Sequence, residues 1–194
     1  LDQKDAAVES YKQAVLLKPD YAKAHYNLGG ALQEIGQLDD AVKSYESAIA
    51  LEPDNAEANN NLGNVLRELR KYHEAVARYN KAVAIRPDYA LAHANLGVTF
   101  SDLGKLDEAL TSYNKAISIN PEYTEARFNL GVVLYEIQQF KKAAVLYQQV
   151  LQAREKYSGM HHPTTFTASW NLGIVYQDLN ELHLAEPLLQ RTLQ

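Results

Sequence analysis

The sequence contains no cysteine, which excludes disulfide bonds, thiolate metal sites and a cysteine nucleophile. This absence fits a reducing compartment, and we expect a soluble, cytoplasmic protein. Proline and glycine are scarce, with 6 and 9 residues among 194, so a β-rich fold with many tight turns is disfavoured. Because 46% of the residues are apolar, the chain has enough apolar surface for a core, and we expect helices to build it.

Long apolar runs and an excess of basic residues are also missing. The sequence has no run of about 18 apolar residues and no charged-then-apolar leader, so membrane insertion is not expected. The formal net charge of -5 argues against nucleic acid as a partner, because phosphate binding needs Lys and Arg gathered on one face. The chain starts at Leu1 rather than Met, and we interpret it as a segment of a longer protein.

What the sequence does contain is an internal repeat of 34 residues. A Leu-Gly pair recurs at this step and once more after 42 residues, beginning at Leu28, Leu62, Leu96, Leu130 and Leu172. Alanine, tyrosine and proline follow at fixed distances, and the first copy places them at Ala41, Tyr45 and Pro53. Self-similarity of this period indicates stacked supersecondary units that share a continuous core.

These motifs resemble the tetratricopeptide repeat (TPR) family over essentially the whole chain. The resemblance implies an all-α fold, a right-handed superhelical solenoid of antiparallel helix pairs. The early units look like the repeat arm of O-linked N-acetylglucosamine transferase, and the last unit looks like the repeat of kinesin light chains. Both relatives hold peptides in a groove, so the resemblance implies a protein or peptide as the partner.

We expect a single array over residues 1–194. It would comprise a truncated repeat at 1–21, repeats at 22–55, 56–89 and 90–123, a modified repeat at 124–165 and a last helix pair at 166–194. Neither end carries the polar face of a capping repeat, so end-to-end self-association of the segment is a further expectation. In the modified repeat, Glu155 replaces the expected proline, and the second helix is predicted to continue to near Tyr157 and stop at Gly159.

A glycine in the middle of each first helix costs about 1 kcal/mol relative to alanine, so something must compensate. For Gly63 we expect close approach of the partner helix, with Ala75 and Ala82 facing the glycine and Tyr79 filling the gap between layers. Gly36 and Gly104 are predicted to end helices in the left-handed conformation.

An asparagine stands directly before every Leu-Gly pair, at Asn27, Asn61, Asn95, Asn129 and Asn171. Asparagine is an indifferent helix former, so its recurrence asks for a reason. On the inner surface of the array, the five amides would form a ladder that holds the backbone of an extended peptide. The TPR resemblance implies the same role. The alternative is that these amides bond to neighbouring residues or are merely tolerated there.

An acidic residue recurs later in the same helices, at Glu34, Glu68, Asp102, Glu136 and Asp178. Such a row would attract basic segments of a partner, and its alternative role is an ordinary solvated face. Tyr26, Phe128 and Trp170 precede their asparagines and would add either apolar pockets or packing between helices. We select Trp170 as a candidate contact because tryptophan is enriched at binding hot spots.

Nothing in the sequence points to catalysis, and we expect no catalytic residue, no cofactor and no metal site. Neither HExxH nor GxSxG occurs, and His161, His162 and His183 are better explained as loop and surface histidines. The TPR resemblance implies that binding of a chaperone's C-terminal carboxylate needs Lys or Arg at the asparagine position or four residues before it. Only Lys23 fits this pattern, so that function is disfavoured too.

We therefore interpret the chain as a non-enzymatic interaction scaffold that binds an extended peptide or disordered segment in its groove. Two alternatives stay open. The chain is a substrate-recognition arm of a larger, glycosyltransferase-like enzyme, or it is a self-assembling scaffold whose contacts lie at its ends or on its convex face.

Overall fold

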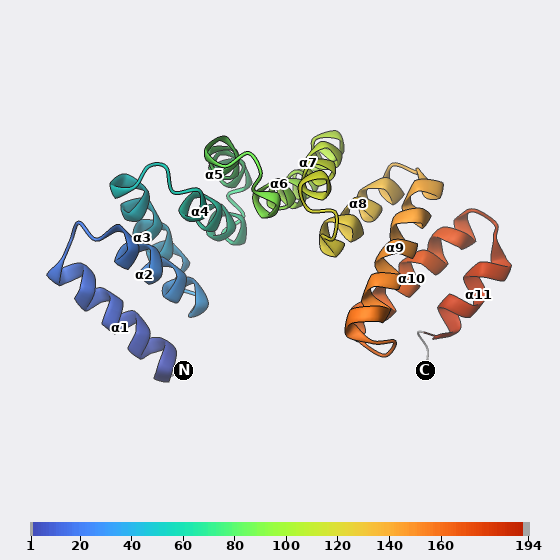
Figure 1. Cartoon of the computed structure of the whole chain (residues 1–194), viewed down its shortest axis with the longest axis horizontal. Coiled ribbons are helices and arrows are strands. Elements are labelled where there is room, and N and C mark those ends of the chain that lie inside the picture. Colours follow the sequence, from blue (N-terminus) through green and yellow to red (C-terminus); the bar gives the residue numbers. More distant parts are fainter. Residues whose placement is uncertain (1, 192–194) are drawn as a thin grey trace. The chain divides into compact units, whose positions relative to one another are not determined.

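The computed structural model describes residues 2–191, which form helices and no strand. Short loops separate the helices (Figure 1). In chain order, the helices are α1 (Asp2–Leu17), α2 (Ala22–Glu34), α3 (Leu38–Leu51), α4 (Ala56–Glu68), α5 (Tyr72–Ile85), α6 (Ala90–Asp102), α7 (Leu106–Ile119), α8 (Thr124–Glu136), α9 (Phe140–Ser158), α10 (Pro163–Asp178) and α11 (Leu182–Gln190). The all-α class predicted from the repeat is confirmed.

The chain divides into two compact units, residues 1–103 and residues 104–194. In unit 1, α2 packs against α3 and α4 against α5, and each pair stacks on the next so that α2, α4 and α6 lie side by side. In unit 2, α8 pairs with α9 and α10 with α11, while α7 packs on α8. We call each pair a layer, the helix with the Leu-Gly pair its first helix, and the other its second helix.

The core of unit 1 includes an apolar stripe along α4. In α4, Ala58, Leu62, Val65 and Leu66 are buried and Leu69 is partly buried. The three buried larger side chains and Leu69 join leucines of α2 and α6 and tyrosines of α3 and α5 in one apolar cluster. Because each layer contributes to its neighbour's core, burial of this surface depends on stacking.

The mid-helix glycines make room for the repeat tyrosine. A Cβ added to Gly63 would lie 2.6 Å from the Tyr79 ring, and the Tyr79 side chain is fully buried. The same close approach joins Gly29 to Tyr45 and Gly131 to Tyr147. The tyrosine ring itself, rather than a small residue of the second helix, is therefore the nearest neighbour of the glycine.

The turn after each first helix contains a residue in the left-handed conformation. Gly36 and Gly104 have φ of 77° and 70°, as predicted. The matching positions of the other repeats hold Arg70, Gln138 and Asn180, with φ of 59°, 60° and 59°. The repeat geometry thus imposes this conformation even where the residue is not glycine, at a cost of about 1–2 kcal/mol.

The second helix of the modified repeat is longer than the others, as predicted. α9 continues to Ser158, and Gly159 leaves the helix with φ of 90°. The next helix begins at Pro163, because proline suits the first helical position. The His162 side chain caps this helix by accepting a hydrogen bond from the Thr164 N–H.

A buried arginine holds the extension in place. Arg154 is only 8% exposed, and it donates to the Thr164 carbonyl at 2.7 Å and to the Glu125 carboxylate at 3.0 Å. Its guanidinium also lies 4.5 Å from the centre of the Phe128 ring. The extra turns of α9 are thereby tied both to α8 and to the start of α10.

The contact between glycine and tyrosine predicts that two alanine substitutions differ in their effect on stability. Gly63→Ala should lower the free energy of unfolding by about 1–3 kcal/mol, because the buried Tyr79 ring cannot move away. Gly30→Ala is the control, since its Cβ would only touch the Tyr45 hydroxyl at 3.5 Å. It should be neutral or stabilising by up to about 1 kcal/mol. Urea denaturation measures both, and equal effects would contradict the packing argument.

Candidate functional site

The five predicted asparagines occupy one position of the first helices, directly before a buried leucine, and all five are half-buried. In unit 1 they are Asn27 on α2, Asn61 on α4 and Asn95 on α6, and in unit 2 they are Asn129 on α8 and Asn171 on α10.

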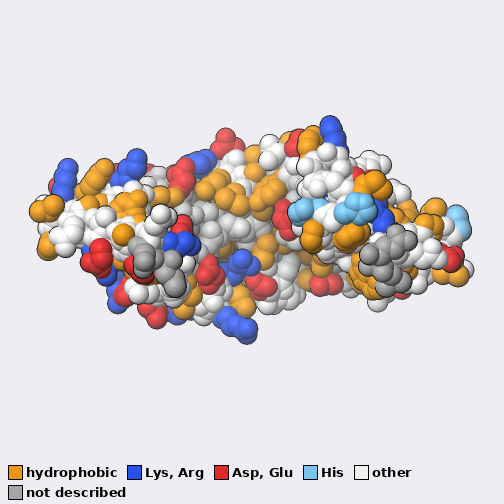
Figure 2. All heavy atoms as spheres, turned by 90° about the horizontal axis from the view of Figure 1, so that it is seen from below, with side chains coloured by type: hydrophobic (Ala, Val, Ile, Leu, Met, Phe, Trp, Pro, Cys, Tyr) orange, Lys and Arg blue, Asp and Glu red, His pale blue; other side chains and the backbone are white. Residues whose placement is uncertain are grey.

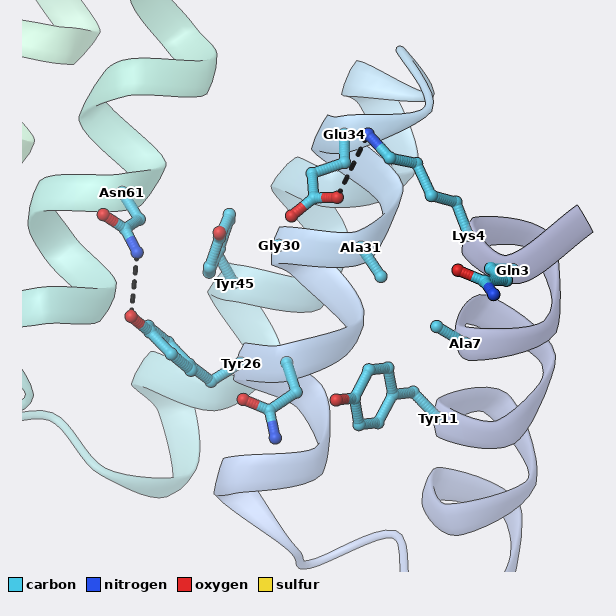
Figure 3. Close-up of a pocket in the computed structure, with 11 residues that line it drawn as sticks. Gln3, Lys4, Ala7, Tyr11, Tyr26, Gly30, Ala31, Glu34, Tyr45 and Asn61 are labelled. Atoms are coloured by element: carbon cyan, nitrogen blue, oxygen red, sulfur yellow. Dashed lines mark hydrogen bonds and ion pairs between the residues drawn. The ribbon is translucent and has the colours of Figure 1, made fainter. Parts of the chain in front are cut away.

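In unit 1, two of these amides bond to the preceding layer. The Asn61 Nδ2 donates to the Tyr26 hydroxyl at 2.9 Å (Figure 3). The Asn95 Nδ2 donates to the Oδ1 atoms of Asn60 at 2.9 Å and Asn64 at 3.1 Å. Asn60 is fully buried, so this bond satisfies an oxygen that solvent cannot reach. Asn61 and Asn95 thus contribute to the stacking of layers.

The other asparagines differ in their surroundings. Asn171 lies beside the Tyr147 hydroxyl. Asn27 and Asn129 make no side-chain hydrogen bond with any residue that the structure describes. Their amide groups are half-buried, so both keep donor and acceptor capacity for a ligand.

The acidic row also makes contacts between layers. Each carboxylate of unit 1 meets the layer before it, through Lys4 with Glu34 at 3.3 Å, Gln33 with Glu68, and Arg67 with Asp102 at 3.6 Å. All three carboxylates are exposed, so each contact contributes little to stability, about 0–1 kcal/mol. Two of the three already have a basic partner within the chain.

The acidic residues of unit 2 have no such cation. Asp178 accepts a hydrogen bond from the Tyr135 hydroxyl at 2.7 Å. Burial is the main reason that the pKa of the Tyr147 hydroxyl is raised, and the negative charge of Glu136 adds to this rise. Neither carboxylate forms an ion pair with a Lys, Arg or His among residues 2–191. The negative charge of these two positions is therefore uncompensated at short range.

Several predicted residues of unit 1 meet at one hollow, which we call hollow 1 (Figure 3). Its volume is about 330 Å3, and α1, α2, α3 and α4 contribute to its walls. Asn27, Asn61 and Glu34 line it, together with the rings of Tyr11 and Tyr26. Figure 3 shows Lys4 reaching from α1 to the Glu34 carboxylate at the rim.

Unit 2 contains a second cavity, hollow 2, of about 270 Å3. Its walls come from α8, α9 and α10, and the lining is Val132, Tyr135, Tyr147, Trp170, Asn171 and Ile174. Tyr147 and Asn171 match Tyr45 and Asn61 in the repeat. The two hollows therefore occupy the same place in the repeat, over the second-helix tyrosine and beside the asparagine of the following first helix.

One repeat position, which sequence analysis overlooked, changes the space over the repeat tyrosine of unit 1. Gly30 borders hollow 1, whereas Asn64 stands at the matching position one repeat later. The Asn64 Oδ1 accepts from the Tyr79 hydroxyl at 2.8 Å and from Asn95, so its side chain fills the space. The difference between Gly30 and Asn64 is visible when the repeats are aligned, so the sequence alone could have indicated this position.

The aromatic residues before the asparagines take different roles. Trp170 lines hollow 2 and is 46% exposed. Tyr26 packs edge-on against Tyr45, with ring centres 5.7 Å apart, and Phe128 packs against Tyr147 at 5.6 Å. Trp170 thus borders a pocket, while Phe128 packs between helices and Tyr26 does both.

The repeat tyrosines remain protonated over the physiological range. Burial raises the pKa of Tyr45, Tyr79 and Tyr147 to about 12. The hydrogen bond to the Asp178 carboxylate raises the pKa of Tyr135. The Tyr45 and Tyr147 hydroxyls, which line the two hollows, can therefore donate hydrogen bonds there.

Other kinds of site find little support in the described part of the chain. Within residues 2–191, no group of three or more His, Asp and Glu side chains is arranged to hold a metal ion. His161, His162 and His183 are exposed, and acidic and basic side chains are interspersed on the face in Figure 2. No helix among these residues is long and apolar enough to cross a membrane.

The buried amide contacts predict that two equivalent asparagines differ in their effect on stability. Asn95→Ala should lower the free energy of unfolding by about 1–3 kcal/mol, because it leaves the buried Asn60 oxygen without a donor. Asn27→Ala should change it by less than about 0.5 kcal/mol, since no described residue bonds to that side chain. Chemical denaturation of both variants tests this difference, and similar losses would refute it.

The raised tyrosine pKa values predict alkaline destabilisation. The folded state holds its phenolic protons above pH 10, where the unfolded chain releases them, so stability is complete below pH 10 and falls toward pH 12. Tyr79→Phe removes one of the three groups, and its free energy of unfolding should decline less steeply over this interval. Urea denaturation at several pH values tests the slopes, and parallel curves would argue against the assignment.

Comparison with solved structures places the fold among known repeat arrays. MamA shares 26% identity and a TM-score of 0.76, with 80% of this chain and 91% of MamA covered. YrrB, described as a TPR protein with an unusual peptide-binding site, shares 24% identity and a TM-score of 0.76 over 96% and 92% of the two chains. The pilF protein of Pseudomonas aeruginosa shares 21% and a TM-score of 0.81 over 96% and 82%. The last two show the fold alone.

Family models cover most of the chain, although no curated protein matches it. The tetratricopeptide repeat model matches residues 54–122 and 123–194, and the TPR repeat model matches residues 2–36 and 32–69. Proteins with this repeat are in general non-enzymatic scaffolds for protein–protein interaction. The chain therefore belongs to the tetratricopeptide repeat family and to its class of protein–protein interaction scaffolds.

Proposed function

We propose that the chain binds an extended peptide or disordered segment of a partner protein along its first helices, with ligand side chains entering hollows 1 and 2. The observation that carries this proposal is the recurrence of a hollow at the same repeat position in both units, each bordered by a predicted asparagine. The peptide-binding site of YrrB, a similar fold, supports a peptide as the class of ligand.

We assign different roles to the five asparagines. Asn27 and Asn129 have no described side-chain partner, so their amides are the ones we assign to the ligand backbone. Asn171 borders hollow 2 and can offer a remaining N–H, whereas Asn61 is already bonded to Tyr26 and Asn60. Asn95 is committed to Asn60 and Asn64. The proposed ladder is thus interrupted at Asn95, where the chain bonds to itself.

An extended ligand suits this arrangement because its backbone groups are unpaired. A helical ligand satisfies its own N–H and C=O groups, whereas a strand-like segment offers them to amide side chains. Alternate side chains of such a segment point to opposite sides, so one set can enter a hollow while the other faces solvent. Half-buried amides beside a hollow can therefore bond to the ligand backbone while the hollow accommodates one ligand side chain.

Filling hollow 1 with a side chain tests the proposal. Gly30→Asn copies Asn64, so the new amide should reach the Tyr45 hydroxyl and Asn61 and occupy the cavity. Binding to an array of short extended peptides, varied in charge and apolar content, should weaken about tenfold for the peptides that use unit 1. Gly30→Ala is the matched control, because a methyl group leaves the hollow open.

Circular dichroism melts should show that both variants fold, since each replaces glycine in a helix with a better helix former. The proposal is refuted if no peptide of the array binds the wild type, or if Gly30→Asn binds every peptide as tightly as the wild type does.

A further inference from the structure

We propose that hollow 2 receives a Lys or Arg side chain of the bound segment, which makes unit 2 the part of the chain that selects basic partners. This inference rests on the proposed function, since it specifies which side chain of the peptide is read and where.

The walls of hollow 2 suit a long side chain with a cationic end. Trp170, Tyr135 and Tyr147 supply three aromatic rings, and Val132 and Ile174 add aliphatic surface. The methylene stem of Lys or Arg packs well on such surfaces, and its charged group interacts favourably with the face of an aromatic ring. Trp170 is 46% exposed, so its ring is accessible from outside.

Two carboxylates without a basic partner lie near tyrosines that line this hollow. The Asp178 carboxylate accepts a hydrogen bond from the Tyr135 hydroxyl at 2.7 Å. Glu136 is close enough to the Tyr147 hydroxyl for its charge to contribute to the raised pKa of that group. Both side chains are exposed. Lys141 and Lys142 line a neighbouring hollow but form no ion pair with either carboxylate. A cation in hollow 2 would therefore find uncompensated negative charge on two helices.

Unit 1 shows how a cation sits at the equivalent place. Arg67 of α4 lies beside the Tyr79 hydroxyl and pairs with the Asp102 carboxylate of the following first helix at 3.6 Å. The chain thus places its own guanidinium over a repeat tyrosine and against the acidic row. Tyr135 occupies the position of Arg67 in unit 2, so that cation is missing there.

Hollow 1 differs from hollow 2 in its charge. Its carboxylate, Glu34, already pairs with Lys4, and amides and hydroxyls rather than aliphatic groups form much of its lining. A basic ligand side chain would have to displace Lys4 to reach Glu34. The preference for a cation therefore belongs to hollow 2.

Trp170 provides a local readout because it is the single tryptophan of the chain. The probes are short extended peptides that share one uncharged sequence and differ at a central residue, which is Arg, Lys, Gln or Glu. Titration of the full chain, followed by tryptophan fluorescence, should show the Arg and Lys peptides binding about tenfold more tightly than the Gln peptide. This difference should shrink as salt is added.

A matched pair of variants locates the cation site. Tyr135→Arg copies Arg67, so the chain's own guanidinium should fill hollow 2 and remove the preference for Arg and Lys peptides. Tyr135→Phe keeps the aromatic wall and leaves Asp178 without its hydroxyl donor, so the preference should remain. Circular dichroism melts of both variants report whether the fold is intact.

Carboxylate variants test which of the two units carries the preference for basic peptides. Glu136→Gln combined with Asp178→Asn should abolish the preference, whereas Glu34→Gln combined with Asp102→Asn should preserve it, because those acids pair with Lys4 and Arg67.

The outcomes distinguish this inference from the proposed function. If Arg, Lys and Gln peptides bind equally, peptide binding stands and the cation site is refuted. A preference that survives in folded Tyr135→Arg also refutes it, because the cation then sits elsewhere. If none of these peptides and none of the array peptides binds, both the proposed function and the inference fail.

Discussion

The repeat tyrosine packs its ring on a mid-helix glycine, and this contact sets how closely the two helices of a layer approach. The glycine lacks a side chain, so the ring can approach to 2.6 Å from the point where a Cβ would lie at Gly63, and to 2.8 Å at Gly131. The buried ring compensates for the poor helix propensity of glycine through close packing. Its hydroxyl then reaches the space between first helices, where Tyr79 meets Asn64 of its own layer and Tyr147 meets Asn171 of the following layer.

The surface chemistry of each unit follows from what covers that hydroxyl. At Tyr79 the chain uses its own side chains, Asn64 and Arg67, and the place is filled. At Tyr45 the glycine Gly30 leaves a polar hollow, and at Tyr147 a cavity with aromatic walls remains open. A scaffold with nearly identical layers thus presents different chemistry at each one, because a few positions around a common tyrosine vary.

Much of this architecture was readable from the repeat. The apolar stripe of α4, the left-handed turns at Gly36 and Gly104 and the extension of α9 to Gly159 depend on local spacing, propensity and φ preference, so a single sequence reveals them. The left-handed conformation of Arg70, in contrast, goes against its local preference and comes from the repeat geometry.

The candidate site was only partly readable in the same way. The sequence by itself determined the fold class, the repeat period and which helix positions carry asparagine or acid, because these depend on residue type and spacing along one helix. The tertiary structure decided which of those groups the chain already uses. Asn95 is committed to Asn60, while Asn27 has no described side-chain partner. The physical reason is that these bonds join residues about one repeat apart, and whether a side chain spans that gap depends on the stacking distance and on its neighbours in the adjacent layer.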